Sequence, residues 1–120
     1  MNISQVRAQA LEGRMTDFAL NCIGLSRRIP KNAENRIILN QLVRASSSIG
    51  ANYTEANNAV SRLDFRNKIY IAKKETSEAR YWLRLLSRAN PEIEINPLIN
   101  ESTELLLILQ KSITTLKNGK

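Results

Sequence analysis

Basic side chains recur along residues 61–88 at the spacing of one helix face. At about 100° per residue, six of them fall within an arc of roughly 80°. A row of guanidinium and ammonium groups binds phosphates, and a tyrosine near the same arc is placed to stack on a nucleobase. We therefore predict a nucleic-acid-binding surface made of Arg62, Arg66, Tyr70, Lys73, Arg80, Arg84 and Arg88.

The positive charge of the chain is concentrated in this same stretch. The 120 residues carry a net charge of +7 with a pI near 10.0, and residues 61–88 hold eight basic and three acidic side chains. A local basic excess is typical of proteins that bind an anionic partner such as nucleic acid. A solvated helix face is the alternative interpretation, because charge by itself specifies a partner only weakly.

The residue types that most often carry catalysis are missing or isolated. There is no histidine, the commonest general base and metal ligand. Cys22 is the only cysteine and lies in an apolar stripe, so we expect a buried hydrophobe there and no nucleophile. Glu101 and Glu104 have the spacing of di-iron bundles but lack the histidines of such sites. We expect them, like Glu75 and Glu78, to be solvated surface, and we expect no enzyme activity, no metal and no cofactor.

The elements that must position these residues are helices. Glycine and proline are scarce, at 4 and 3 residues, aromatic residues make up 5%, and apolar residues recur every three or four positions. The pattern predicts one domain over residues 1–120, all-α, folded as an antiparallel up-down-up-down four-helix bundle. The helices are expected at about 4–28, 33–58, 62–89 and 97–117.

Several residues predict where these helices begin. Ser61 is a good N-cap and makes a capping-box variant with Asp64. Val60 and Phe65 flank that cap at the spacing of a hydrophobic staple. The pair Asn96–Pro97 places a capping residue before a proline and predicts the start of the last helix.

The second predicted helix combines small residues with a polar stripe. Gly50 in its middle costs about 1 kcal/mol relative to alanine, which indicates that another helix approaches closely there. The polar stripe consists of Gln41, Arg44, Ser48, Asn52 and Glu55. It is either a solvated flank or a buried polar network at a subunit contact. The residues alone favour the solvated flank, because a buried charge is costly unless it is paired.

The expected compartment follows from charge and cysteine content. A single cysteine allows no intrachain disulfide, which suits a reducing cytosol. The first twenty residues contain charged side chains at positions that a signal peptide keeps apolar. The longest aliphatic run, Leu105–Leu109, is far too short for a membrane span. We expect a cytoplasmic protein that does not associate with membranes.

Two runs of the sequence resemble the signature of a known family. They are Gln41–Ala56 and Phe65–Leu83, and Ile29–Lys31 before them matches the junction between the first two helices. These residues resemble the bacterial four-helix-bundle family named for the 23S rRNA intervening sequence, sometimes catalogued as a ribosomal protein. The likeness covers about residues 15–117.

The resemblance implies properties that periodicity does not show. Members of the family are four-helix bundles that tend to form ring-shaped homopentamers, and some are encoded within insertions in 23S rRNA genes. A related group comprises accessory proteins of diversity-generating retroelements, which bind nucleic acid and a reverse transcriptase. In a ring, the polar stripe around Arg44 and Asn52 would line a subunit contact as a satisfied network.

These observations lead to two functional hypotheses. The first is a non-enzymatic basic homo-oligomer that binds RNA or another nucleic acid by shape and charge, with the pentamer and the 23S rRNA association implied by resemblance. The second is an oligomeric scaffold or protein-interaction adaptor, in which the same arginines pair with acidic groups on other subunits or partners.

Overall fold

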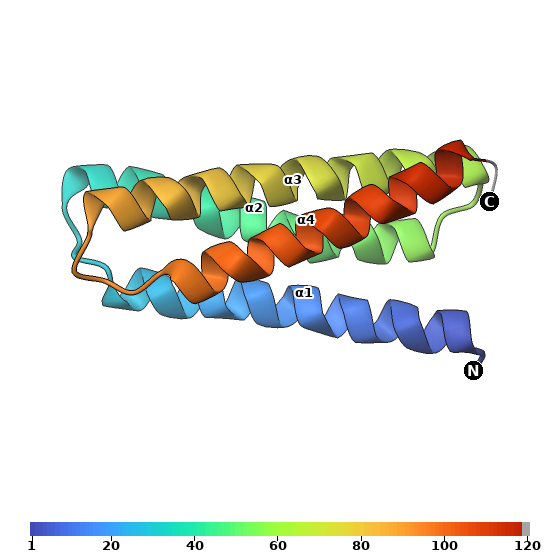
Figure 1. Cartoon of the computed structure of the whole chain (residues 1–120), viewed down its shortest axis with the longest axis horizontal. Helices are drawn as coiled ribbons and strands as arrows, with labels where there is room; N and C mark the ends of the chain where they lie inside the picture. The colour runs from blue at the N-terminus through green and yellow to red at the C-terminus, as the bar shows by residue number, and fades with distance from the viewer. Residues whose placement is uncertain (119–120) are drawn as a thin grey trace.

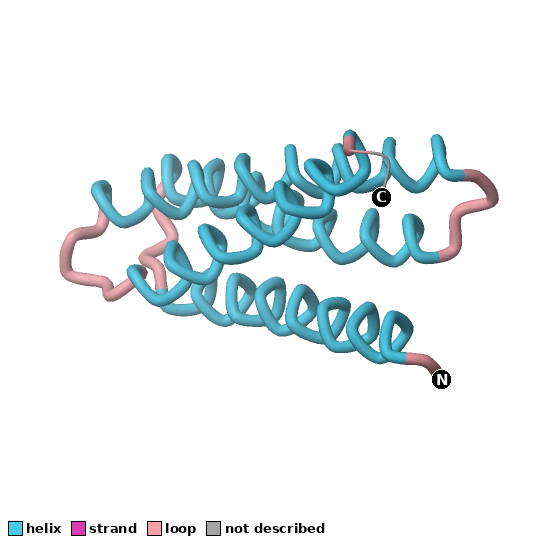
Figure 2. The backbone as a smooth tube through the Cα atoms, turned by 45° about the vertical axis from the view of Figure 1, so that its right-hand side comes forward, coloured by secondary structure: helices cyan, strands magenta, loops and turns pink. Residues whose placement is uncertain are grey.

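Four helices make up the part of the chain that the structure describes, residues 1–118 of a computed structural model. They are α1 (Ile3–Arg28), α2 (Ala33–Asn57), α3 (Arg62–Ala89) and α4 (Asn96–Lys117). Consecutive helices run in opposite directions, and the loops that join them are short (Figures 1 and 2). The predicted all-α, four-helix bundle is confirmed, and the last two residues of the predicted domain lie outside the described range.

The predicted apolar spacing accounts for the core. Each helix contributes buried side chains every three or four residues, as an antiparallel bundle requires. In α3 these are Ile69, Ala72, Thr76, Ala79, Leu83 and Leu86. Phe65, one turn before Ile69, is half-buried and packs against this core.

The α1 helix passes close to Gly50, as the sequence predicts. A Cβ atom added at Gly50 would lie 3.4 Å from the Cβ atom of Met15. That distance is ordinary van der Waals contact, so α1 packs beside Gly50, but an alanine would also fit at this position.

The predicted start of α3 is confirmed in one part and wrong in another. The Ser61 hydroxyl oxygen accepts a hydrogen bond from the backbone N–H of Asp64 at 3.0 Å. The hydrophobic staple is absent, because Val60 lies in the bend between α2 and α3 with 95% of its surface exposed.

The predicted cap of α4 is also wrong. Asn96 is the first residue of the helix, and Ile95 occupies the N-cap position without a side-chain hydrogen bond. Ile95 is buried in the core, and the helix starts one residue earlier than predicted. The Glu94 carboxylate accepts a hydrogen bond from the backbone N–H of Asn96 at 3.0 Å and so satisfies one donor of the first turn.

A pair of buried asparagines joins the two loops at one end of the bundle. Each amide donates to the other's oxygen: Asn35 to Asn90 at 3.0 Å and Asn90 to Asn35 at 3.1 Å. The same amides donate to the carbonyls of Pro30 and Leu86. Both side chains are almost fully buried, and the pair ties the α1–α2 connection to the end of α3.

Removing one member of this pair should be costly. We expect Asn35→Ala and Asn90→Ala each to lower the free energy of unfolding by about 1–3 kcal/mol, because each leaves a buried amide without its partner. Urea unfolding at one protein concentration measures the effect, and a double-mutant cycle isolates the coupling. Asn40→Ala, an exposed change on α2, is the matched control. Equal stabilities of all three variants would contradict a structural role for the pair.

Candidate nucleic-acid interface

The predicted basic residues lie along one side of α3, and Arg80 among them contacts α4. The Arg80 guanidinium donates to the hydroxyl of Thr103 on α4 at 2.8 Å, which places the middle of the row at the edge between the two helices. The remaining members lie on the same side of α3 because they share the arc of Arg80. Lys73 and Arg80 are half-buried, and the other five predicted residues are exposed. We call the seven predicted residues the basic stripe.

Most cations of the basic stripe keep their charge unneutralised. Within residues 1–118, Arg66, Lys73, Arg84 and Arg88 have no carboxylate at ion-pair distance. Arg80 is bonded to a neutral hydroxyl, so its charge is not compensated by that contact. The surface therefore presents positive charge along one edge of the bundle.

Two shallow hollows interrupt the stripe, and each combines two guanidinium groups with apolar surface. Near the start of α3, a hollow of about 210 Å³ is lined by Arg62, Leu63, Arg66 and Leu116. Near its end, a second hollow of about 180 Å³ is lined by Tyr81, Arg84, Leu85 and Arg88. A phosphate beside a sugar or a base complements such a hollow, because its charge is opposite and its neighbour offers apolar surface.

Tyr81 is a member of this surface that the sequence reasoning missed. Its side chain is 55% exposed, against 38% for Tyr70. Its ring meets the ring of Trp82 edge-on, with centroids 5.2 Å apart, which limits its orientation. Helical spacing could have indicated Tyr81. It follows Arg80 directly and so lies about 100° around the helix, next to the edge of the roughly 80° arc that the basic stripe occupies.

The polar stripe of α2 meets α3 and is largely occupied by contacts within the chain. Arg44 pairs with Glu75 at 2.9 Å and with Glu78, and its Nε donates to Gln41 at 3.3 Å. Farther along, Asn52 donates to the carbonyl of Ser48, and Glu55 lies 3.4 Å from the ammonium group of Lys68. None of the five stripe residues is buried in the single chain.

The acidic partners in this network correct one expectation. Glu75 and Glu78 are paired across the helix interface by Arg44 of α2, not left as solvated surface. Their side chains are 12% and 32% exposed. Burial acts to raise the pKa of Glu78, but the hydrogen bond and charge of Arg44 outweigh it and lower the pKa below its ordinary value.

The other chemical candidates are also engaged. Arg14 of α1 holds Glu101 through two hydrogen bonds of 2.7 Å and lies 3.3 Å from Glu104. Glu101 is therefore a half-buried ion-pair partner, whereas Glu104 is exposed as expected. Cys22 is completely buried, and burial raises the pKa of its thiol to about 12 against a small opposing effect of the Ser46 hydroxyl.

The fold and this surface define a class: a basic four-helix bundle with a row of cations along one edge. A family model described as 23S rRNA-intervening sequence protein matches residues 11–111. The chain therefore belongs to the 23S rRNA-intervening sequence protein family.

A solved structure supports the same assignment. The chain is similar to a protein of unknown function from the S23 ribosomal protein family of Bacteroides thetaiotaomicron VPI-5482, at 35% identity. The match covers 85% of this chain and 96% of that one, with a TM-score of 0.77. No protein with curated function matches the sequence. Within the described residues, every helix falls short of the combined length and apolar character that crossing a bilayer demands.

The pH dependence of stability tests the Arg44 network. Because the folded-state pKa of Glu78 is depressed, its pairing stabilises the fold above the ordinary value of 4.5 and is lost as pH falls through the folded value. Arg44→Met should cost up to about 1 kcal/mol at neutral pH, since the pair is partly exposed, and the cost should shrink in acid. Urea unfolding of both proteins from pH 7 to pH 3 measures it, with Arg27→Met as control. A cost that is the same at both ends of the range would contradict the pairing.

The burial of Cys22 predicts an inert thiol. In the folded protein at pH 8, reaction with a thiol reagent should be at least about 100-fold slower than in guanidinium chloride, because a buried thiol of raised pKa reacts only after local opening. Absorbance of the thionitrobenzoate released from Ellman's reagent follows the reaction. Similar rates in the two conditions would show that Cys22 is accessible in the folded protein and could act as a nucleophile.

Proposed function

We propose that this protein is a non-enzymatic bundle that binds RNA or another nucleic acid along the basic stripe of α3. The observation that supports this most directly is the row of cations at Arg66, Lys73, Arg84 and Arg88, which have no carboxylate partner among the described residues. Glu75 and Glu78 on the same helix are paired by Arg44 of α2, so they do not cancel this row. A polyanion supplies the missing counter-charge.

Recognition on this surface would depend on charge and shape. The stripe contacts phosphates, and the exposed rings of Tyr70 and Tyr81 are available to stack on unpaired bases. No helix-turn-helix, zinc or other base-reading motif accompanies them in the sequence. RNA is the first nucleic acid to test, because the family description refers to 23S rRNA.

We further propose that the protein assembles with copies of itself, with a pentamer as the size implied by family resemblance. The face where α2 meets α3 supports this step. Beside the Arg44 network, the side chain of Trp82 is half-buried, and Ile37 is 66% exposed. A second subunit placed on this face would cover the apolar groups and exclude water from the network. Repetition of the basic stripe around a ring would multiply its charge.

The same face supports an alternative function. An assembly whose subunit contacts lie at Arg44 and Trp82 would serve as a scaffold or protein-interaction adaptor without any nucleic acid. Changes to the basic stripe distinguish the two functions. A scaffold requires the α2–α3 face, whereas a nucleic-acid binder requires the cations beside α4.

Charge reversal on the stripe tests the proposal. Arg66→Glu, Lys73→Glu and Arg80→Glu together should abolish retention of a fluorescein-labelled structured RNA, because phosphates then meet like charge. For the unmodified protein, log affinity should fall with log salt at a slope near −4 if about five phosphates are neutralised. Fluorescence anisotropy over a salt series measures both quantities.

The control must carry the same change in net charge. Arg27→Glu, Arg28→Glu and Arg36→Glu alter three exposed cations outside the basic stripe. This variant should bind the RNA within a few-fold of the unmodified protein, and both variants should keep the circular dichroism spectrum of a folded bundle. Equal RNA retention by the two triple variants would overturn the proposed interface. Absence of binding by the unmodified protein, together with salt-labile oligomers, would favour the scaffold.

A further inference from the structure

The first three turns of α1 lack a core of their own. The buried residues of this helix begin at Met15, and Ile3 and Val6 are 70% and 53% exposed. Figures 1 and 2 show α1 and α4 diverging toward the end of the bundle where both termini lie. Four helices therefore share a core over most of the molecule, but only three remain packed together at this end.

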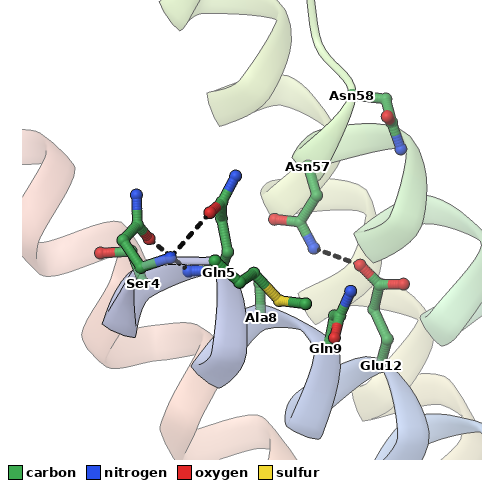
Figure 3. A pocket seen from close by; sticks show the side chains of 9 residues that line it. Ser4, Gln5, Ala8, Gln9, Glu12, Asn57 and Asn58 are labelled. Atoms are coloured by element: carbon green, nitrogen blue, oxygen red, sulfur yellow. Dashed lines mark hydrogen bonds between the residues drawn. The ribbon is translucent and has the colours of Figure 1, made fainter.

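Two contacts fix α1 in this diverging position. Asn57 of α2 donates to the carboxylate of Glu12 at 2.7 Å, and this bond holds α1 against α2 (Figure 3). Farther along, the ion pair of Arg14 with Glu101 joins α1 to α4. The opening between α1 and α4 thus begins beyond Arg14 and widens toward the N-terminus.

A groove of about 670 Å³ occupies this opening, and all four helices contribute to it. Its apolar surface comes from Ala8, Leu11, Tyr53, Phe65, Ile108 and Leu116. Four of these, Leu11, Phe65, Ile108 and Leu116, are half-buried, so the groove exposes large apolar side chains that a complete four-helix layer would cover. Along α4 it extends over residues 108–116, which is roughly 12 Å or two helical turns.

The charges around the groove have one sign. Arg7 of α1 and Lys111 of α4 line it from opposite sides, and no acidic residue lines it. Neither cation has a carboxylate at ion-pair distance within residues 1–118. An occupant that fits this groove is therefore apolar on the face that enters it and anionic along its flanks.

We propose that this groove binds an acidic amphipathic helix of a partner protein. A helix fits because the groove lies where α1 and α4 separate, and three apolar side chains at positions i, i+4 and i+7 span its length. Acidic residues beside them would meet Arg7 and Lys111. A second copy of this chain fits less well, because none of its four helices carries more acidic than basic side chains.

A designed peptide tests this site with the full-length protein. The probe is a fluorescein-labelled helical peptide of about 16 residues, long enough to form several turns, with leucines at the spacing given above and glutamates on both flanks. A second peptide replaces every glutamate with glutamine. Ala8→Trp fills the groove, and Ala10→Trp, on the exposed side of the same helix and outside the groove, is the matched control.

We expect Ala8→Trp to weaken binding of the glutamate peptide at least about tenfold, while Ala10→Trp leaves it within about twofold. Arg7→Glu with Lys111→Glu should weaken the glutamate peptide by a similar factor and the glutamine peptide much less, because only the charge complementarity is lost. The Arg66, Lys73 and Arg80 triple variant should bind the peptide normally, which separates this groove from the nucleic-acid surface.

Three outcomes would overturn the proposal. The first is equal binding of the peptide by the two tryptophan variants, and the second is no detectable binding to the unmodified protein. The third is a lower oligomer mass for Ala8→Trp than for Ala10→Trp in sedimentation velocity, which would identify a second copy of the chain as the occupant.

Discussion

The close packing of α2 against α3 fixes the rotation of the central helix, and the rest of the surface depends on that rotation. The buried residues of these two helices include short side chains, with Ala45 and Ala56 on α2 and Ala72 and Ala79 on α3. Short side chains let two helix backbones approach closely. Only one rotation of α3 about its axis then directs its apolar residues into the core. Polar residues flanking them are consequently directed to two different edges of the bundle.

The two edges of α3 differ in how their charges are satisfied. On the α2 side, Glu75 and Glu78 meet Arg44, so the charges are compensated within the chain. On the α4 side, the Arg80 guanidinium donates a hydrogen bond to the neutral hydroxyl of Thr103. One helix thus separates a neutralised edge from a cationic edge, and this separation distinguishes the basic stripe from a uniformly charged helix surface.

The sequence was sufficient for the architecture because the bundle follows from local rules. Apolar spacing located all four helices, and the Ser61 cap and the close approach at Gly50 followed from single-residue chemistry. The errors at Val60 and Asn96 arose where a local motif competes with the path of the chain. At Asn96 the burial of Ile95 decides the outcome, and no local pattern contains that information.

Contacts between distant residues were beyond the reach of sequence patterns. The amides of Asn35 and Asn90 are 55 positions apart, and Arg14 and Glu101 are 87 apart, so neither pair has a helical spacing that could indicate it. Arg44 stands out in the sequence as the charged member of the polar stripe with Glu55, but its partners on α3 depend on how the two helices are aligned. The basic stripe was easier to predict because all its members lie on one helix.

The asparagine pair makes the two ends of the bundle unequal in their resistance to local opening. Separating the loops at that end would break reciprocal buried hydrogen bonds, whereas α1 contributes no buried side chain of its own before Met15. Fluctuations of the backbone should accordingly be concentrated near the chain termini, and amide protons there would exchange with solvent while those of α3 stay protected. We therefore expect the asparagine end to open only with the whole bundle and the first turns of α1 to fray independently of it.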